Sequence, residues 1–186
     1  MKLNELLDGV ALAARHVQDV ECSGICCDTR EMTPGCLFVA LPGYKTDGHR
    51  YIRQALERGA AAVLCQRPPE GEGPWLVTED TRAALAIASA NWFGHPAREM
   101  KVIGITGTKG KTTTTFMVKG ILEHAGYKVG LMGTIEIIIG EEHIPACNTT
   151  PESYLIQEYF ARMVEAGCEL CVMEVSSQGL MMHRTA

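Results

Sequence analysis

Short apolar runs alternate with helical patterns along the first half of the chain. Three runs bounded by turn residues are typical of buried strands, at residues 36–41, 60–65 and 75–78. Two segments have helical spacing, at residues 52–58 and 81–93. Gly59 is placed to end the first helix, and Asp80 or Thr81 to cap the second. This half therefore reads as strands separated by helices.

The second half continues the alternation. Three apolar runs predict strands, at residues 101–106, 128–132 and 169–175, and two shorter runs predict a hairpin, at residues 135–139 and 143–147. One predicted helix carries Val118, Ile121, Leu122 and Ala125 at helical spacing and ends at Gly126. A second carries Ile156, Tyr159, Phe160 and Met163 and ends at Gly167. Thr150 has the place of its cap and Pro151 that of its first helical residue.

Alternating strands and helices predict an α/β fold with mostly parallel sheets covered by helices. Gly94-His95-Pro96 interrupts the pattern, so we expect two domains, residues 1–98 and 99–186. The second domain should be a P-loop, Rossmann-like sheet. A doubly wound domain usually has more strands than this half holds, so we expect it to be truncated at Ala186.

Composition narrows the function classes. Hydrophobic residues make up 46% of the chain and charged residues 21%, which is typical of a globular protein. The net charge of -5 and the lack of a polybasic cluster argue against nucleic-acid binding. No apolar run approaches the roughly 20 residues that span a membrane, and early charges argue against a signal peptide, so a cytoplasmic protein is expected.

The eight cysteines are too few for a disulfide scaffold. Cys36, Cys65, Cys147 and Cys171 lie in or beside apolar runs, where a thiol acts as a small hydrophobic group. Cys168 and Cys171 have the spacing of a metal or redox pair, but no second pair accompanies them. Structural thiols are therefore favoured over a metal or redox role.

A glycine-rich loop joins the strand at 101–106 to the next helix. Its residues are Gly107, Thr108, Lys109, Gly110, Lys111, Thr112 and Thr113. Glycines let backbone N–H groups approach phosphate oxygens, and a helix N-terminus favours anions. Lys111 is placed to reach the β- and γ-phosphates of ATP, and the Thr112 hydroxyl to ligate Mg²⁺. The alternative is a glycine-rich turn without a ligand.

Two details refine this interpretation. The usual P-loop has glycine where this chain has Ile105, and the glycine spacing is not that of a dinucleotide fold. Glu174 ends an apolar run, and the carboxyl end of a parallel strand is where α/β sheets bind ligands. Glu174 is therefore a candidate metal ligand, with a solvated strand-end carboxylate as the alternative.

Four ordered motifs, and the segment that follows the first of them, resemble the Mur ligase family. Residues 102–113 resemble its ATP loop, and Asn148-Thr149-Thr150-Pro151 and residues 173–180 resemble two later motifs. Cys27-Asp28-Thr29-Arg30 and residues 37–49 are similar to its uridine-side motif and to the strand and loop that follow. The resemblance covers essentially the whole chain. It implies a UDP-precursor-binding domain followed by the central ATP-binding domain.

The resemblance also implies a reaction. ATP would phosphorylate a carboxylate of UDP-MurNAc-L-Ala-D-Glu, and the amine of lysine or diaminopimelate would displace phosphate to form an amide. Lys111 would be the catalytic residue, ATP and Mg²⁺ the cofactors, and Thr112 and Glu174 the metal ligands. The implied substrate contacts are Cys27, Thr29, Tyr44, Lys45, Thr46, Asn148, Thr149, Thr150, Ser176 and Arg184.

Simpler roles remain open for several of these residues. Thr149 and Thr150 are also suited to a helix cap, Arg184 to a solvated surface charge, and residues 28–30 to an Asx-type turn. Gln178 and Met182 depart from the family pattern, and a thioether does not replace an amide. The family's modified lysine and amino-acid-selecting domain would lie beyond Ala186, so we expect no turnover by the isolated chain.

Three alternative functions stay open. They are the related ligase that adds D-Ala-D-Ala, an unrelated P-loop kinase or carboxylase, and a nucleotide-binding fragment without activity. The oligomeric state is not indicated.

Overall fold

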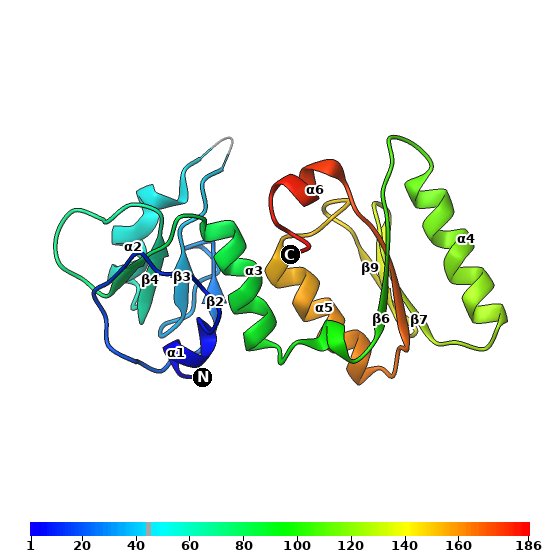
Figure 1. Cartoon of the computed structure of the whole chain (residues 1–186), viewed down its shortest axis with the longest axis horizontal. Helices are drawn as coiled ribbons and strands as arrows, with labels where there is room; N and C mark the ends of the chain where they lie inside the picture. The colour runs from blue at the N-terminus through cyan, green and yellow to red at the C-terminus, as the bar shows by residue number, and fades with distance from the viewer. Residues whose placement is uncertain (44–45) are drawn as a thin grey trace. The chain divides into compact units, whose positions relative to one another are not determined.

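The computed structural model describes residues 1–43 and 46–186 (Figure 1). Tyr44 and Lys45, both predicted to contact substrate, lie outside the described residues. Two units, Met1–Trp92 and Phe93–Ala186, each have their own core. The predicted break at Gly94-His95-Pro96 lies directly after this division.

The first unit is built on a five-stranded sheet. Its strand order is β1 (Ala14–Arg15), β5 (Trp75–Val77), β4 (Ala62–Cys65), β3 (Leu37–Val39) and β2 (Ile25–Cys26). All neighbours are parallel except β1 and β5. The helices are α1 (Leu3–Leu6), the 3₁₀ helix η1 (Gly48–Tyr51), α2 (Ile52–Glu57) and α3 (Thr81–Trp92). The predicted strands and helices of this half are confirmed, with ends shifted by at most two residues.

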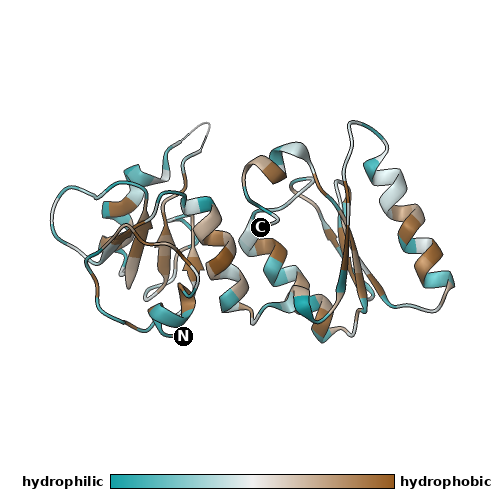
Figure 2. Cartoon of the chain, in the orientation of Figure 1, coloured by the Kyte–Doolittle hydropathy of each residue, from teal (hydrophilic) through white to brown (hydrophobic). Residues whose placement is uncertain are grey.

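The central strands of this unit are buried on both faces, which explains why they read as continuous apolar runs. Figure 2 shows this hydrophobic centre in the strands. One apolar cluster joins Phe38 and Val63 to Ile52 and Ala55 of α2. This core holds the strands in place and so sets where the loops after β2 and β3 begin.

The second unit has strand order β6 (Lys101–Ile105), β10 (Leu170–Glu174), β7 (Val129–Met132), β8 (Glu136–Ile139) and β9 (Glu142–Pro145). The first three are parallel, and β7, β8 and β9 pair antiparallel. Helices α4 (Lys111–His124) and α5 (Ser153–Glu165) cover opposite faces of the sheet (Figure 1). The remaining helices are η2 (Pro96–Arg98) and α6 (Ser177–Met181). The predicted α/β class is confirmed.

Residues of β10 alternate between the two faces. Cys171 and Met173 join the cluster of Phe160 on α5, whereas Val172 joins the cluster that packs against Leu122 of α4. The predicted apolar stripe of α5 is confirmed, because Ile156, Phe160 and Met163 are buried and Tyr159 packs beside them. The sheet therefore has a large core under α5 and a small one under α4.

Two helix predictions were wrong in detail. Ile121 is 66% exposed, because α4 turns Thr115, Val118 and Leu122 towards the sheet. The predicted start of α5 at Thr150 is also wrong, since the helix begins at Ser153 and the Thr150 hydroxyl bonds elsewhere.

The cysteines are reduced throughout the described residues. Cys36, Cys65 and Cys171 are buried as predicted, but Cys147 is exposed. Burial raises the pKa of Cys65 to about 11, so this thiol stays protonated near neutral pH. Within residues 1–43 and 46–186, no helix combines the length and apolar composition needed to cross a bilayer.

Candidate functional site

The glycine-rich loop lies between the end of β6 and the start of α4. Gly107 and Gly110 have φ angles of 149° and 79°, and Gly110 is the N-cap of α4. Residues with a Cβ atom rarely adopt such backbone angles, so glycine is needed at both positions. Ile105 is the last residue of β6 and pairs with Glu174, which places it before the turn. The loop's tight bends therefore begin after the position at which the usual motif has glycine.

The loop presents a positive site at the carboxyl edge of the sheet. Lys111 is the first residue of α4, and its Nζ donates to the Gly107 carbonyl at 2.8 Å. The first turn of a helix has N–H groups without helical partners, and the helix dipole adds partial positive charge there. This arrangement suits the phosphates of a nucleotide.

Glu174 lies at the end of β10 with only 1% of its surface exposed. Its Oε2 accepts from the Thr112 hydroxyl at 3.0 Å, and its Oε1 from the Thr134 N–H at 2.8 Å. The Thr134 hydroxyl lies 3.1 Å from Oε2. Among the described residues, no cationic side chain pairs with this carboxylate. A buried carboxylate without a cation is costly, so the site is suited to an added cation.

The oxygen chemistry fits Mg²⁺, which prefers carboxylate, hydroxyl and phosphate oxygens. Thr112 and Glu174, the two predicted metal ligands, are brought together across 62 residues of sequence. No cluster of three or more His, Cys, Asp or Glu side chains offers another metal site in the described residues. Thr134 was missed from the sequence. Its signal was its place just after β7, the strand beside β10.

Gly133 leaves room for the Glu174 carboxylate. A Cβ on Gly133 would lie 2.7 Å from Glu174 Oε1, so Gly133→Ala must displace the carboxylate. We expect Mg²⁺-dependent nucleotide affinity, measured by calorimetry, to fall about tenfold, since a misplaced ligand weakens a metal site. Gly120→Ala is the control, because a Cβ there meets open space. Equal affinity in the Gly133 variant would contradict the carboxylate's role.

Thr150 joins the loop before α5 to the end of β10. Its Oγ1 accepts from the Ser176 N–H at 3.0 Å and lies 3.1 Å from the Glu174 carbonyl. Ser176 in turn caps α6 by accepting from the Gly179 N–H at 3.0 Å. Thr150 is 1% exposed, so it connects the end of β10 and the start of α6 from the protein interior.

Arg184 completes this second group of predicted residues. Its guanidinium donates to the Thr150 carbonyl at 2.9 Å and pairs with Glu152 at 2.5 Å, and its side chain is 14% exposed. It is therefore not a solvated surface charge. Asn148 is exposed, and Thr149 Oγ1 lies 3.1 Å from Thr134 Oγ1, which links this group to Glu174. The substrate roles of these residues stay predictions.

Thr150→Val should destabilise the second unit by roughly 1–3 kcal/mol, because the buried Glu174 carbonyl and the partly buried Ser176 N–H lose their hydrogen bonds to the Thr150 hydroxyl. Urea unfolding followed by circular dichroism measures this. Thr114→Val on exposed α4 surface makes the same chemical change as a control. Equal stability of the two variants would show that the Thr150 hydroxyl is dispensable.

The first unit contains a cavity of about 550 Å³ at the carboxyl ends of β2 and β3. Its lining residues are Cys27, Asp28, Thr29, Arg30, Leu41, Gly43, Thr46, Gly48, Tyr51 and Gln54. Cys27, Thr29 and Thr46, three of the predicted uridine-side residues, thus lie together. The volume is in the range of about 300–1,000 Å³ that small-molecule sites have.

Thr29 is buried, and its hydroxyl donates to Gln54 Oε1 at 2.9 Å. Asp28 and Arg30 form an Asx-type turn, in which Asp28 Oδ1 accepts from the Arg30 N–H at 2.9 Å. Hydrogen bonds from the Arg30 guanidinium hold the pKa of Asp28 below its ordinary value. Gln54 and Tyr51 were missed from the sequence, because only the packing of η1 and α2 brings them to the cavity.

Comparison with known families gives two matches. Residues 21–103 match the model described as "Mur ligase family, catalytic domain", and residues 105–186 match "Mur ligase middle domain". These matches cover the cavity of the first unit and nearly all of the phosphate-loop unit.

Named relatives agree with the matches. The chain is 46% identical over 99% of its length to the UDP-N-acetylmuramoyl-L-alanyl-D-glutamate--2,6-diaminopimelate ligase of Caldanaerobacter subterraneus, and 44% identical over 99% to that of Clostridium botulinum. It spans 39% of the length of either relative.

Solved structures share the fold. A ligase structure with the same 2,6-diaminopimelate title aligns with a TM-score of 0.80 at 23% identity, over 99% of this chain and 37% of that one. MurF from Acinetobacter baumannii aligns with a TM-score of 0.64 at 24% identity, over 94% of this chain and 35% of that one.

Proposed function

Because the chain belongs to the Mur ligase family, we propose that it supplies the nucleotide-handling part of an ATP-dependent ligase in peptidoglycan precursor synthesis. The proposed reaction adds 2,6-diaminopimelate to UDP-MurNAc-L-Ala-D-Glu, as the names of the relatives indicate. The observation that carries the proposal is the contact between Thr112, at the end of the phosphate loop, and the buried Glu174.

The proposed chemistry is phosphoryl transfer followed by amide formation. The terminal phosphoryl group of ATP passes to a carboxylate of the UDP precursor, which gives an acyl phosphate and ADP. The amine of diaminopimelate then attacks the acyl carbon, phosphate leaves, and the amine loses a proton. Phosphoryl transfer depends on positioning and charge neutralisation more than on covalent chemistry from the protein.

The second unit carries residues for the first step. Lys111 and the N-terminus of α4 bind and orient the phosphates, and Gly107 and Gly110 let the backbone approach them. Thr112 and Glu174 would hold Mg²⁺, which when bound supplies positive charge against the phosphate oxygens. Thr134 orients the Glu174 carboxylate through its N–H. Asn148, Thr149, Ser176 and Arg184 are proposed to serve the muramoyl side of the precursor.

The first unit is proposed to bind the uridine side of the precursor in its cavity. Thr29 and Gln54 offer a hydroxyl and an amide side by side, and an amide and a hydroxyl together provide both hydrogen-bond donors and acceptors. Tyr51 is 41% exposed at the cavity and offers an aromatic face.

Thr29→Val tests the cavity. The substitution removes the hydroxyl at nearly constant volume, so the affinity for UDP-MurNAc-L-Ala-D-Glu in calorimetry should fall about tenfold, the equivalent of about 1.4 kcal/mol. Thr33→Val, on an exposed residue of the same unit, is the control and should bind like the wild type. A folded Thr29 variant with unchanged affinity would place the uridine site elsewhere.

A further inference from the structure

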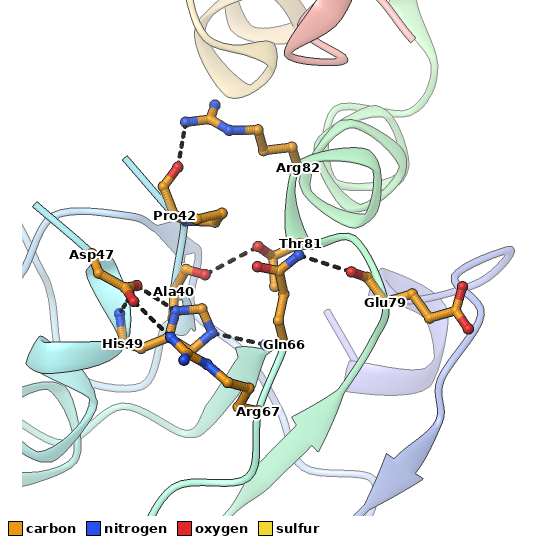
Figure 3. A network of polar contacts seen from close by, with 9 residues as sticks. All are labelled: Ala40, Pro42, Asp47, His49, Gln66, Arg67, Glu79, Thr81 and Arg82. Atoms are coloured by element: carbon orange, nitrogen blue, oxygen red, sulfur yellow. Dashed lines mark hydrogen bonds and ion pairs between the residues drawn. The ribbon is translucent and has the colours of Figure 1, made fainter. Parts of the chain in front are cut away.

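The loop that follows β3 contributes one wall of the cavity in the first unit. Its described residues Gly43, Thr46 and Gly48 line the cavity. Asp47 and His49 alternate with these residues and belong to a separate polar network (Figure 3). The network reaches Gln66 and Arg67, which follow β4, the next strand of the sheet.

We infer that Asp47 and His49 form a positioning pair, which fastens the base of this loop to the end of β4 and so pre-organises the cavity for the nucleotide of the precursor. The inference rests on the uridine-side function proposed above for this cavity. It assigns to Asp47 and His49 no direct contact with the ligand.

The hydrogen bonds of His49 use both ring nitrogens. Asp47 Oδ1 lies 2.6 Å from His49 Nδ1, and His49 Nε2 lies 2.9 Å from the backbone nitrogen of Gln66. A backbone N–H only donates, so Nε2 must be the acceptor. Nδ1 must then carry the proton and donate a hydrogen bond to Asp47. The His49 side chain is 11% exposed. His49 is therefore held in one tautomer and one orientation between the loop and the strand end.

Asp47 holds the loop side of the pair. Its Oδ1 also accepts from the His49 N–H at 3.0 Å, so it caps η1 as well as orienting the ring. This backbone hydrogen bond, with the ring and Arg67 adding to it, holds the pKa of Asp47 below its ordinary value. Arg67 pairs with Asp47 Oδ2 at 2.8 Å but is 73% exposed, so it contributes little.

The base of the loop is too tight to adjust independently of this pair. Pro42 and Asp47 form an antiparallel bridge, and the Gly48 N–H donates to the Leu41 carbonyl at 2.9 Å. A Cβ on Gly48 would lie 2.7 Å from the Leu41 nitrogen, which shows how closely the two backbones approach. A shift of Asp47 must therefore move its neighbours Thr46 and Gly48, which line the cavity.

Holding this wall in place lowers the ordering cost of binding. A ligand that meets a pre-organised loop loses less conformational entropy than one that must order it. Removing His49 should therefore weaken uridine-nucleotide binding while leaving ATP binding, which uses the other unit, unchanged.

The test compares His49→Ala, His49→Phe and His49→Gln by calorimetry with UDP and with Mg·ATP. A glutamine amide keeps one donor and one acceptor, whereas phenylalanine fills the nearly buried space and has neither. We expect UDP affinity to fall about tenfold in H49A and H49F and to stay within about threefold of the wild type in H49Q. Arg53→Ala, which breaks only an exposed ion pair with Glu57, is the control.

Thermal unfolding of the same proteins separates positioning from stability. UDP affinity that is equal in wild type, H49A and H49F would overturn the inference, as would losses that are equal in H49Q and H49F and follow the fall in Tm. If H49A does not fold, the H49F and H49Q pair decides. A wild type that binds no UDP would instead overturn the proposed uridine site itself.

Discussion

Replacing Lys111 with alanine is expected to reduce the affinity of the chain for Mg·ATP by about 100-fold. The ammonium group lies at the start of α4, where its Nζ contacts the Gly107 carbonyl of the same loop. Without it, the phosphates keep only the backbone N–H groups and the helix dipole, which provide partial charges. Calorimetric titration with Mg·ATP measures the loss.

Lys119→Ala is the matched control. Lys119 lies two turns further along α4 and pairs with Glu123, so its removal changes the net charge equally without reaching the loop. The control should bind Mg·ATP like the wild type, and the Lys111 variant should keep its stability because the Lys111 ammonium makes only an exposed hydrogen bond. A Lys111 variant that binds like the control would exclude the loop as the phosphate site.

Glu174→Gln should separate metal binding from folding. The amide keeps the shape of the side chain and still accepts from the Thr134 N–H, but it removes the negative charge. We expect the gain in ATP affinity on addition of Mg²⁺ to be about 100-fold smaller in the variant than in the wild type. Without metal, the variant should be at least as stable as the wild type, because a neutral amide replaces a buried carboxylate that has no cation beside it.

Glu169→Gln, on an exposed residue that precedes β10, is the control for charge. ATP affinity should be measured with and without Mg²⁺, and stability by urea unfolding in a metal-free buffer. Retained Mg²⁺ dependence in the Glu174 variant, with a marked loss of metal-free stability, would make this carboxylate structural.

The elements that could be predicted are those whose burial is visible in the local pattern. The runs of β4 and β10 are buried along their whole length, so they read as strands directly. The two-residue strands β1 and β2 are too short to leave a pattern. The side of α4 that faces solvent was mispredicted, because the spacing of apolar residues does not show how a helix is rotated against a small core.

The candidate sites divide in the same way. The phosphate loop is local in sequence, and Glu174 follows from its place at the end of a parallel strand. Thr134 and Gln54 become visible only through tertiary contacts with Glu174 and Thr29. Thr150 also suited a helix cap, but its hydroxyl instead bonds the backbone of Glu174 and Ser176, which no pattern of residues reveals. Its substrate contact stays a prediction.

The most direct test of two separate nucleotide sites is calorimetry of the wild-type chain with Mg·ATP, before and after saturation with UDP-MurNAc-L-Ala-D-Glu. The proposed function predicts one site per chain for each ligand, with the stoichiometry for Mg·ATP unchanged by the precursor. Competition between the two ligands for a single site, or a folded chain that does not bind the precursor, would contradict it.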